Sequence, residues 1–348
     1  ETFMISTLAL LSFLAVSPAR ASGLPAPEPV KLSPDAAPLH LDDYYYDPVL
    51  KKLVVPGDRT GKLLLIDADS HDLSFLDVIE PPKVDTGAPE SKPEAGFTSA
   101  DGGEGLIFTV NRAERKLYVV DPVETDAKKR VIASAALASS PDFIRYVSPT
   151  REVWVTEPKK NQIEVFSLSA STAMRPITPV QEVVIPSAHG EYESLLIDAG
   201  RKRAYSNQES DTVVIDLQTK RIVAAWKNGC RNATGLALDG ARGFLLVACR
   251  EGRASSLDLK DGRKISTVKT GNGLDVIAYS PEKQLVYLPG AKSATLTIAS
   301  LSDAGELKDL AKGSSAKGAH CVAVDKTGGA WVCNGESGRL LYFAPLED

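Results

Sequence analysis

Acidic side chains and histidines recur at equivalent places in this chain of 348 residues. Several of them stand five residues before the end of a short segment that alternates between apolar and polar residues, as a β-strand does. Others fall in the loops beside these places. Carboxylates and imidazoles gathered together hold polar or cationic ligands; carboxylate oxygens suit Ca²⁺ or Mg²⁺, and histidine adds Zn²⁺ or Mn²⁺. The candidate ligand-binding residues are Asp42, Asp142, His189, Glu193, Asp275 and His320.

Two functions are compatible with such residues. One is binding of a polar or cationic ligand without reaction. The other is hydrolysis of a lactone or ester, in which a bound divalent cation polarises the substrate and activates water while a carboxylate acts as general base. The metal ligands would then be Asp42, Glu193, Asp275 and His320. A third alternative is that all these residues are solvated loop residues without a ligand.

Known catalytic motifs are absent from the sequence. It contains no HExxH, GxSxG or P-loop motif, and no GxGxxG between a strand and a helix. We therefore expect a binding or scaffold module rather than an enzyme, with no cofactor unless a divalent cation such as Ca²⁺ binds. The hydrolase remains the alternative.

The elements that must position these residues are seven copies of one unit. Its clearest copy, Gly235–Val268, contains four strand-like segments with turns at Gly240–Gly243 and Lys260–Gly262. The first segment of each copy ends at residue 47, 101, 148, 198, 239, 280 or 325, which gives intervals of 41 to 54 residues. A period of roughly 40–50 residues with four strands is typical of a β-propeller blade. First strands line the central channel, so the candidate residues are predicted to meet at one mouth of it.

The two ends of the chain are predicted to close the ring. The seventh copy has three strand-like segments, and Glu28–Ser33 is a spare segment before the first copy. Pairing the two would cover an open edge strand. We therefore predict an all-β fold, a seven-bladed β-propeller of four-stranded antiparallel blades, with residues 22–37 as the closing strand and residues 38–348 as the propeller. In four copies the third segment carries an aspartate that we expect to bind the next turn: Asp67, Asp121, Asp216 and Asp258.

The second segments resemble the repeat of a known family. Glu152–Thr156, Arg203–Asn207 and Gln284–Leu288 are similar to the YVTN repeat of exported bacterial propellers, as are the Asp-Gly and Pro-Glu turns and the IDL-like third segments around them. The resemblance covers residues 38–348. It implies an extracytoplasmic propeller from a family linked to surface layers, nucleic acid and small ligands. The hydrolase alternative would make the chain similar to the propeller lactonases, with their acidic channel site.

The first 21 residues resemble a secretory signal peptide. A short apolar run, Ile5–Val16, is followed by Ala19-Arg20-Ala21, so we expect cleavage after Ala21 and a periplasmic or secreted protein. The run is too short to span a bilayer, and we expect no membrane span. The four cysteines fit an oxidising compartment. We predict the disulfides Cys230–Cys249 and Cys321–Cys333, with four buried thiols as the alternative.

Charge and composition limit the partners. The formal net charge is −5, and lysines and arginines form only short runs such as Lys128-Lys129-Arg130 and Lys159-Lys160, so binding to nucleic acid or to an anionic membrane is disfavoured. An unknown protein, glycan or small molecule remains as the partner, and we expect a monomer. Two departures from the repeat are expected: an exposed loop at Pro81–Glu94 and a short helix at Ser302–Lys312. Trp154 and Trp331 are predicted to lie in the core.

Overall fold

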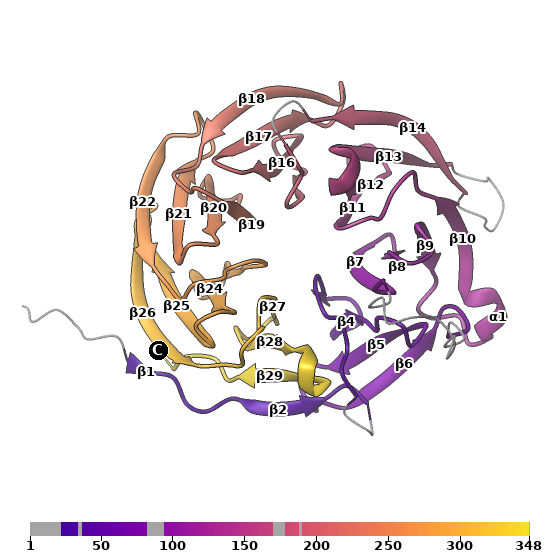
Figure 1. The fold of residues 1–348 in the computed structure, drawn as a ribbon, viewed down its shortest axis with the longest axis horizontal. Coiled ribbons are helices and arrows are strands. Elements are labelled where there is room, and N and C mark those ends of the chain that lie inside the picture. The colour runs from indigo at the N-terminus through magenta and orange to yellow at the C-terminus, as the bar shows by residue number, and fades with distance from the viewer. Residues whose placement is uncertain (1–21, 34–36, 82–93, 170–177, 188–189, 348) are drawn as a thin grey trace, which may run out of the picture.

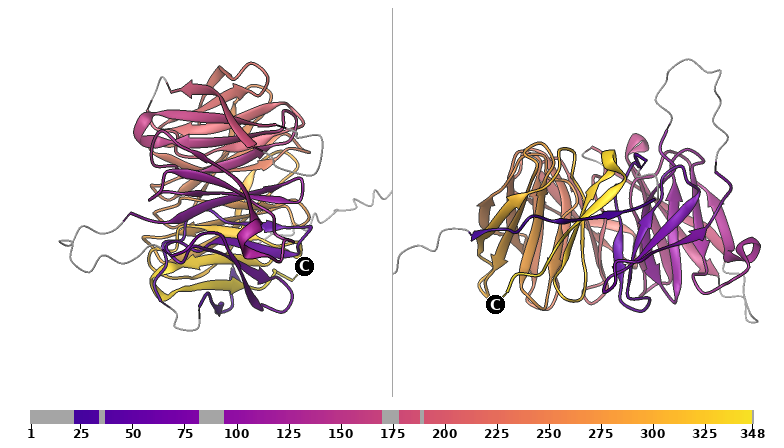
Figure 2. Two further views of the ribbon diagram at one scale, coloured as in Figure 1. Left: turned by 90° about the vertical axis from the view of Figure 1, so that its right-hand side faces the viewer. Right: turned by 90° about the horizontal axis from the view of Figure 1, so that it is seen from below.

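The computed structural model describes residues 22–33, 37–81, 94–169, 178–187 and 190–347. Seven blades of four antiparallel strands stand around a central axis, as Figure 1 shows, and one of these sheets gains a short fifth strand. The side views show a short cylinder (Figure 2). The predicted fold class is confirmed. Helical structure in these residues is limited to α1 (Ala127–Arg130) and two 3₁₀ turns, η1 (Pro158–Lys160) and η2 (Gly335–Ser337).

Each blade runs from an innermost strand at the axis to an outermost strand at the rim. The innermost strands are β3 (Tyr45–Asp47), β7 (Phe97–Gly103), β11 (Ile144–Val147), β15 (Leu196–Asp198), β19 (Ala233–Asp239), β23 (Ala278–Ser280) and β27 (Val322–Val324). The second strands are β4 (Lys52–Pro56), β8 (Leu106–Asn111), β12 (Glu152–Glu157), β16 (Arg203–Gln208), β20 (Phe244–Cys249), β24 (Leu285–Gly290) and β28 (Ala330–Asn334).

The two outer positions complete the blades. The third strands are β5 (Lys62–Asp67), β9 (Lys116–Val120), β13 (Gln162–Ser169), β17 (Asp211–Asp216), β21 (Arg253–Asp258), β25 (Thr295–Leu301) and β29 (Arg339–Phe343). The outermost strands of blades one to six are β6 (Leu73–Asp77), β10 (Val131–Ala136), β14 (Thr178–Pro186), β18 (Arg221–Lys227), β22 (Lys264–Lys269) and β26 (Leu307–Ser314).

The N-terminal segment closes the ring as predicted. Strand β2 (Glu28–Lys31) pairs antiparallel with β29 and is the fourth strand of blade seven. Just before it, β1 (Ser22–Gly23) pairs in parallel with β26 at the rim of blade six. Blades one and seven are also joined at the axis, where the buried hydroxyl of Tyr44 donates to the carbonyl oxygens of Trp331 at 2.8 Å and Cys321 at 3.2 Å. The N-terminal segment therefore joins blades six and seven, and Tyr44 joins blade one to blade seven.

The repeated aspartates bind the turns that follow the third strands. Asp67 Oδ1 accepts the backbone N–H groups of Asp69 and Ser70, each at 3.0 Å. Asp216 accepts those of Gln218 and Thr219. Asp258 accepts the backbone N–H of Lys260, and Asp121 accepts that of Val123. The prediction for these four residues is confirmed, and it explains why an aspartate marks the end of the third strand in four of the blades.

The core lies between neighbouring blades rather than inside one. Trp154 and Trp331 are fully buried, as predicted. Tyr44 and Tyr46 pack in the cluster between blades seven and one, whereas Tyr45 packs in the cluster between blades one and two. This split follows from strand alternation, which sends successive side chains to opposite faces of a sheet.

The helix predicted at Ser302–Lys312 is wrong, because Leu307–Ser314 forms strand β26. Leu307 and Ala311 are buried with three exposed residues between them, a spacing that imitates a helix. The cause is a break in register: Ala299 pairs with Asp309 and Ile298 with Ala311, so Leu310 is an extra residue in the outer strand. This extra residue, a β-bulge, therefore gives the buried residues Leu307 and Ala311 a helix-like spacing in the sequence.

Some predictions fall on residues outside the described ranges. These are the signal peptide at residues 1–21, most of the loop at Pro81–Glu94, and His189. Within the described ranges, none of the helices has the length and apolar character needed to cross a membrane.

Candidate functional site

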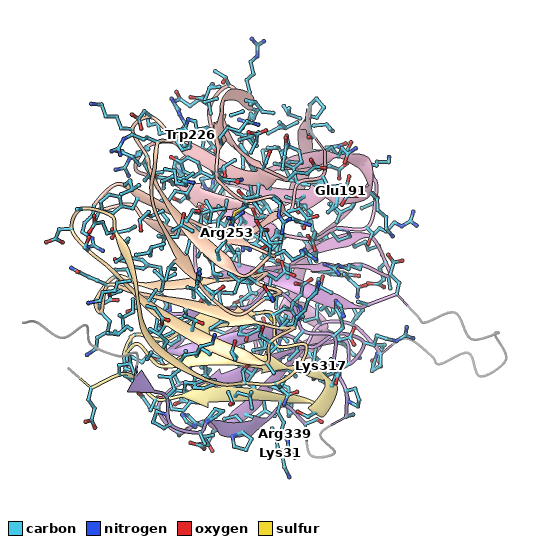
Figure 3. The ribbon with its side chains drawn as sticks, turned by 60° about the vertical axis from the view of Figure 1, so that its left-hand side comes forward. Lys31, Glu191, Trp226, Arg253, Lys317 and Arg339 are labelled. Atoms are coloured by element: carbon cyan, nitrogen blue, oxygen red, sulfur yellow. A yellow bond between two sulfur atoms is a disulfide. The ribbon has the colours of Figure 1, made fainter. Side chains whose placement is uncertain are left out.

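The loops that lead into the innermost strands converge at one end of the channel, here called the mouth. Several innermost strands have only three residues, so the predicted residues lie in the loops just before them. Glu191 and Lys317, from two of these loops, lie toward the same side of the molecule in Figure 3. The mouth loops therefore bring residues from distant parts of the chain together.

Asp42 and Asp142 share one arginine at the mouth. Arg112 Nη2 is 2.7 Å from Asp42 Oδ2 and also contacts Asp142 Oδ1. The same guanidinium donates through Nε to the Pro141 carbonyl at 3.0 Å, and its Nη1 lies 3.4 Å from His40 Nε2. All three charged side chains are partly buried. Arg112 thus neutralises part of the charge that the two carboxylates bring together.

Glu193, Asp275 and His320 lie beside Asp42 and Asp142 and complete a ring of charged residues at the mouth. Glu193 Oε2 lies 3.4 Å from Arg250 Nη2. His320 Nε2 lies 3.8 Å from Asp42 Oδ1, and its Nδ1 is 2.7 Å from the Gly318 carbonyl oxygen. Asp275 is close enough to Asp42, His320, Arg250 and Glu193 for their charges to influence its protonation. The structure therefore brings five of the six predicted residues together.

Burial shifts the protonation of the acidic groups. It raises the pKa of the Asp275 carboxyl to about 6, and the negative charge of Asp42 adds to the rise. Burial and Asp42 also raise the pKa of Asp142 well above its ordinary value, against the opposing effect of Arg112. The pKa of Glu193 is raised by burial as well, with Arg250 opposing the rise. These carboxyls therefore favour the neutral form more than exposed ones do.

Sequence reasoning missed Arg112 and Arg250. Each follows the last residue of a second strand, β8 or β20. Phe97 pairs with Asn111, and Ala233 pairs with Cys249, so the end of each second strand lies beside the start of an innermost strand. Examining the residue that follows each second strand would therefore have identified both arginines as mouth residues.

The mouth opens into a cavity of about 860 Å³, within the size range of small-molecule sites. Its charged lining contains six carboxylates, Asp58, Glu94, Asp142, Glu191, Glu193 and Glu336. It contains three basic side chains, Arg59, Arg112 and Lys159. Lys159 lies 3.6 Å from Glu94 and Arg112 is bound by two aspartates, so two of the three positive charges are already paired with acids. The cavity therefore carries excess negative charge.

Both predicted disulfides are present and both lie at the mouth. The Cα atoms are 5.2 Å apart in Cys230–Cys249 and 5.4 Å apart in Cys321–Cys333. Cys249 directly precedes Arg250, and Cys321 directly follows His320. Each disulfide joins a mouth loop to the end of a second strand. The two bonds therefore restrict the backbone beside two residues of the ring.

The ligand atoms of the ring are not gathered around one point. Among the described residues, the group of three His, Cys or carboxylate ligand atoms within 4.8 Å of one another is His320, Cys321 and Cys333. Its two sulfur atoms are joined in a disulfide, which leaves no thiolate to bind a metal. A cation held by Asp42, Glu193, Asp275 and His320 would require side-chain rotations.

Comparison with known proteins shows the fold alone. No family model and no curated protein matches the chain. Among 1729 matching chains of solved structures is one from the "Crystal Structure of Mitotic Checkpoint Complex". It matches with a TM-score of 0.72 and 12% sequence identity, over 98% of this chain and 99% of that chain. The molecule is a seven-bladed β-propeller, and so widespread a fold identifies no function.

Proposed function

We propose that this propeller is an exported binding module of the YVTN type whose mouth receives a positively charged group of a protein, glycan or small-molecule partner. The observation that carries the proposal is the excess of carboxylates in the 860 Å³ cavity, where the basic side chains Arg112 and Lys159 are already paired with acids. An added cation meets uncompensated negative charge there. The two disulfides support export, because such bonds persist in oxidising compartments.

A charge-matched pair of peptides tests this proposal. We expect fluorescently labelled tetralysine to bind the purified protein at low salt and labelled tetraglutamate of the same length not to bind, as measured by fluorescence anisotropy. Glu193→Gln should weaken tetralysine binding about fivefold, the effect of one partly exposed charge. Glu306→Gln is the control, because Glu306 is exposed between β25 and β26. Equal binding of the two peptides, or equal effects of the two variants, would contradict the proposal.

Metal-dependent hydrolysis of a lactone or ester is the second candidate. The raised pKa of Asp275, about 6, favours it, because a carboxyl that titrates near neutral pH is suited to general acid–base catalysis. Elemental analysis of the purified protein, with melting curves measured with and without EDTA, separates the candidates. A hydrolase should hold one cation per chain, lose it in Glu193→Ala and Asp275→Ala, and melt at a lower temperature with EDTA. A metal-free protein that is indifferent to EDTA would exclude this mechanism.

A further inference from the structure

The ring axis contains a second cavity that shares no lining residue with the mouth. Its volume is about 360 Å³, which is enough for a small organic molecule. Val276 packs against the core cluster of blades seven and one and also against that of blades three and four, so its side chain reaches across the axis. Val276 lines this second cavity and directly follows the mouth residue Asp275 in the chain.

The lining indicates where this axial cavity opens. Among its residues are those that directly precede the last position of an innermost segment in six blades: Tyr46, Ala100, Ile197, Leu238, Tyr279 and Val324. These positions lie at the end of the innermost strands that is remote from the mouth. The cavity therefore opens on the face opposite the mouth.

The wall of the axial cavity has two chemically different sides. Blades one to three contribute three charged side chains, Asp43, Asp101 and Arg145. Blades four to seven contribute mainly aliphatic groups, including Ile197, Leu238, Val276, Ala278 and Val324. A mostly apolar wall with a few convergent polar groups is typical of a small-molecule site. The mouth differs in the six carboxylates of its lining.

The charges on the polar side do not cancel. Arg145 binds Asp43 through two contacts, Nη1 to Oδ2 at 2.6 Å and Nη2 to Oδ1 at 3.0 Å. Such a bidentate pair occupies the guanidinium. Asp101 instead accepts the backbone N–H of Tyr146 at 2.7 Å. Burial raises the pKa of its carboxyl to about 6, against the effect of Arg145. One carboxylate therefore faces the cavity without a dedicated cationic partner.

We propose that the axial cavity binds a small organic amine, with the ammonium group against Asp101 and the apolar body against the aliphatic wall of blades four to seven. The ammonium provides Asp101 with a cationic partner, because the Arg145 guanidinium is already bound to Asp43. The aliphatic side chains bury the hydrocarbon part of the ligand. This site is independent of the mouth and of the function proposed for it.

Three ligands of the same shape test the charge requirement. The ligands are cationic phenethylamine, neutral 2-phenylethanol and anionic phenylacetate. Each is titrated into the purified protein at pH 8, and binding is measured by isothermal titration calorimetry or by saturation-transfer NMR. We expect phenethylamine to bind at least tenfold more tightly than the other two. Absence of phenethylamine binding, or binding no tighter than that of 2-phenylethanol, would overturn the proposal.

Substitutions locate the binding. Asp101→Asn keeps an oxygen to accept the Tyr146 N–H and should weaken phenethylamine binding about tenfold. Ala278→Leu adds volume to the aliphatic wall and should weaken it independently of charge, so the proposal stays testable if one variant folds poorly. If Glu193→Gln weakens phenethylamine binding as much as Asp101→Asn does, the amine binds at the mouth and the axial site is wrong. Tetralysine binding reports on the mouth separately.

Discussion

Replacing Arg112 with methionine is expected to lower the free energy of unfolding by about 2–4 kcal/mol at pH 8, somewhat less than the loss of a fully buried ion-pair partner. The substitution keeps much of the side-chain volume and removes the guanidinium. Asp42 and Asp142, which contact that guanidinium, would then face each other without a counter-charge. Their repulsion and incomplete hydration destabilise the folded state, because each is largely removed from water.

The loss should be smaller at pH 5. Burial and Asp42 already raise the pKa of Asp142 in the intact protein, and without Arg112 it rises further. The variant can then take up a proton at pH 5, which removes one of the two repelling charges. Urea unfolding at pH 5 and pH 8 measures the difference.

Arg151→Met is the matched control for Arg112→Met. Arg151 also binds a carboxylate, with its Nε 2.7 Å from Glu104 Oε1, but this pair lies in solvent at the molecular surface. Water screens exposed pairs, so this variant should change stability far less. If Arg112→Met loses no more stability than Arg151→Met at pH 8, Arg112 does not hold the mouth together.

The fold could be predicted because local signals agree with the global repeat. Each third strand that ends in an aspartate marks its own turn, as Asp67 and Asp216 show through two backbone hydrogen bonds each. The spare segment at Glu28–Ser33 was recognisable because the last copy had one strand too few. The outer strand at Leu307–Ser314 was not recognisable, because the extra residue Leu310 changes the spacing of the buried residues.

The candidate site was only half predictable. Counting back from the innermost strands found Asp42, Glu193, Asp275 and His320, since those residues share a position in the repeat. It could not find Arg112 or Arg250, which belong to the ends of the second strands. The arginines change the chemistry of the site: Asp42, which sequence reasoning offered to a metal, is held by Arg112 together with Asp142 instead.

The axial cavity lay outside sequence reasoning for a different reason. Its polar side depends on which carboxylate receives the Arg145 guanidinium, and the structure gives it to Asp43. Asp43 and Asp101 belong to different blades, so no local pattern decides between them. The uncompensated charge of Asp101 is therefore a property of the assembled ring.

Replacing Asp275 with asparagine is expected to stabilise the protein at pH 8 and to leave its stability at pH 4 nearly unchanged. The folded pKa of Asp275 is raised to about 6 by burial and by Asp42, whereas an unfolded aspartate titrates near 3.9. Between these two values the folded protein binds a proton that the unfolded chain does not. The free energy of unfolding therefore falls as pH rises from about 4 to about 6, and the contribution is constant above that range.

A neutral amide removes this penalty. The expected gain at pH 8 is about 1–3 kcal/mol, discounted because the mouth is open to water. Urea unfolding across pH 4–8 should show a flatter profile for Asp275→Asn than for the parent protein. Asp216→Asn should act in the opposite direction, because hydrogen bonds from Thr219 and Gln218, opposed by partial burial, hold the pKa of the Asp216 carboxyl below its ordinary value. A stability loss in Asp275→Asn at pH 8 would contradict the assignment.

The same variant connects stability to function. A carboxylate that destabilises the folded protein at neutral pH is retained in evolution mainly where the activity of the protein requires it. Asp275→Asn should therefore gain stability and lose tetralysine affinity together at pH 8, and tetralysine binding by the parent protein should weaken as pH falls through about 6, because Asp275 takes up a proton there. If Asp275→Asn gains stability but binds tetralysine as the parent does, Asp275 is not part of the binding site and the remaining carboxylates, Glu193 first among them, must carry the attraction.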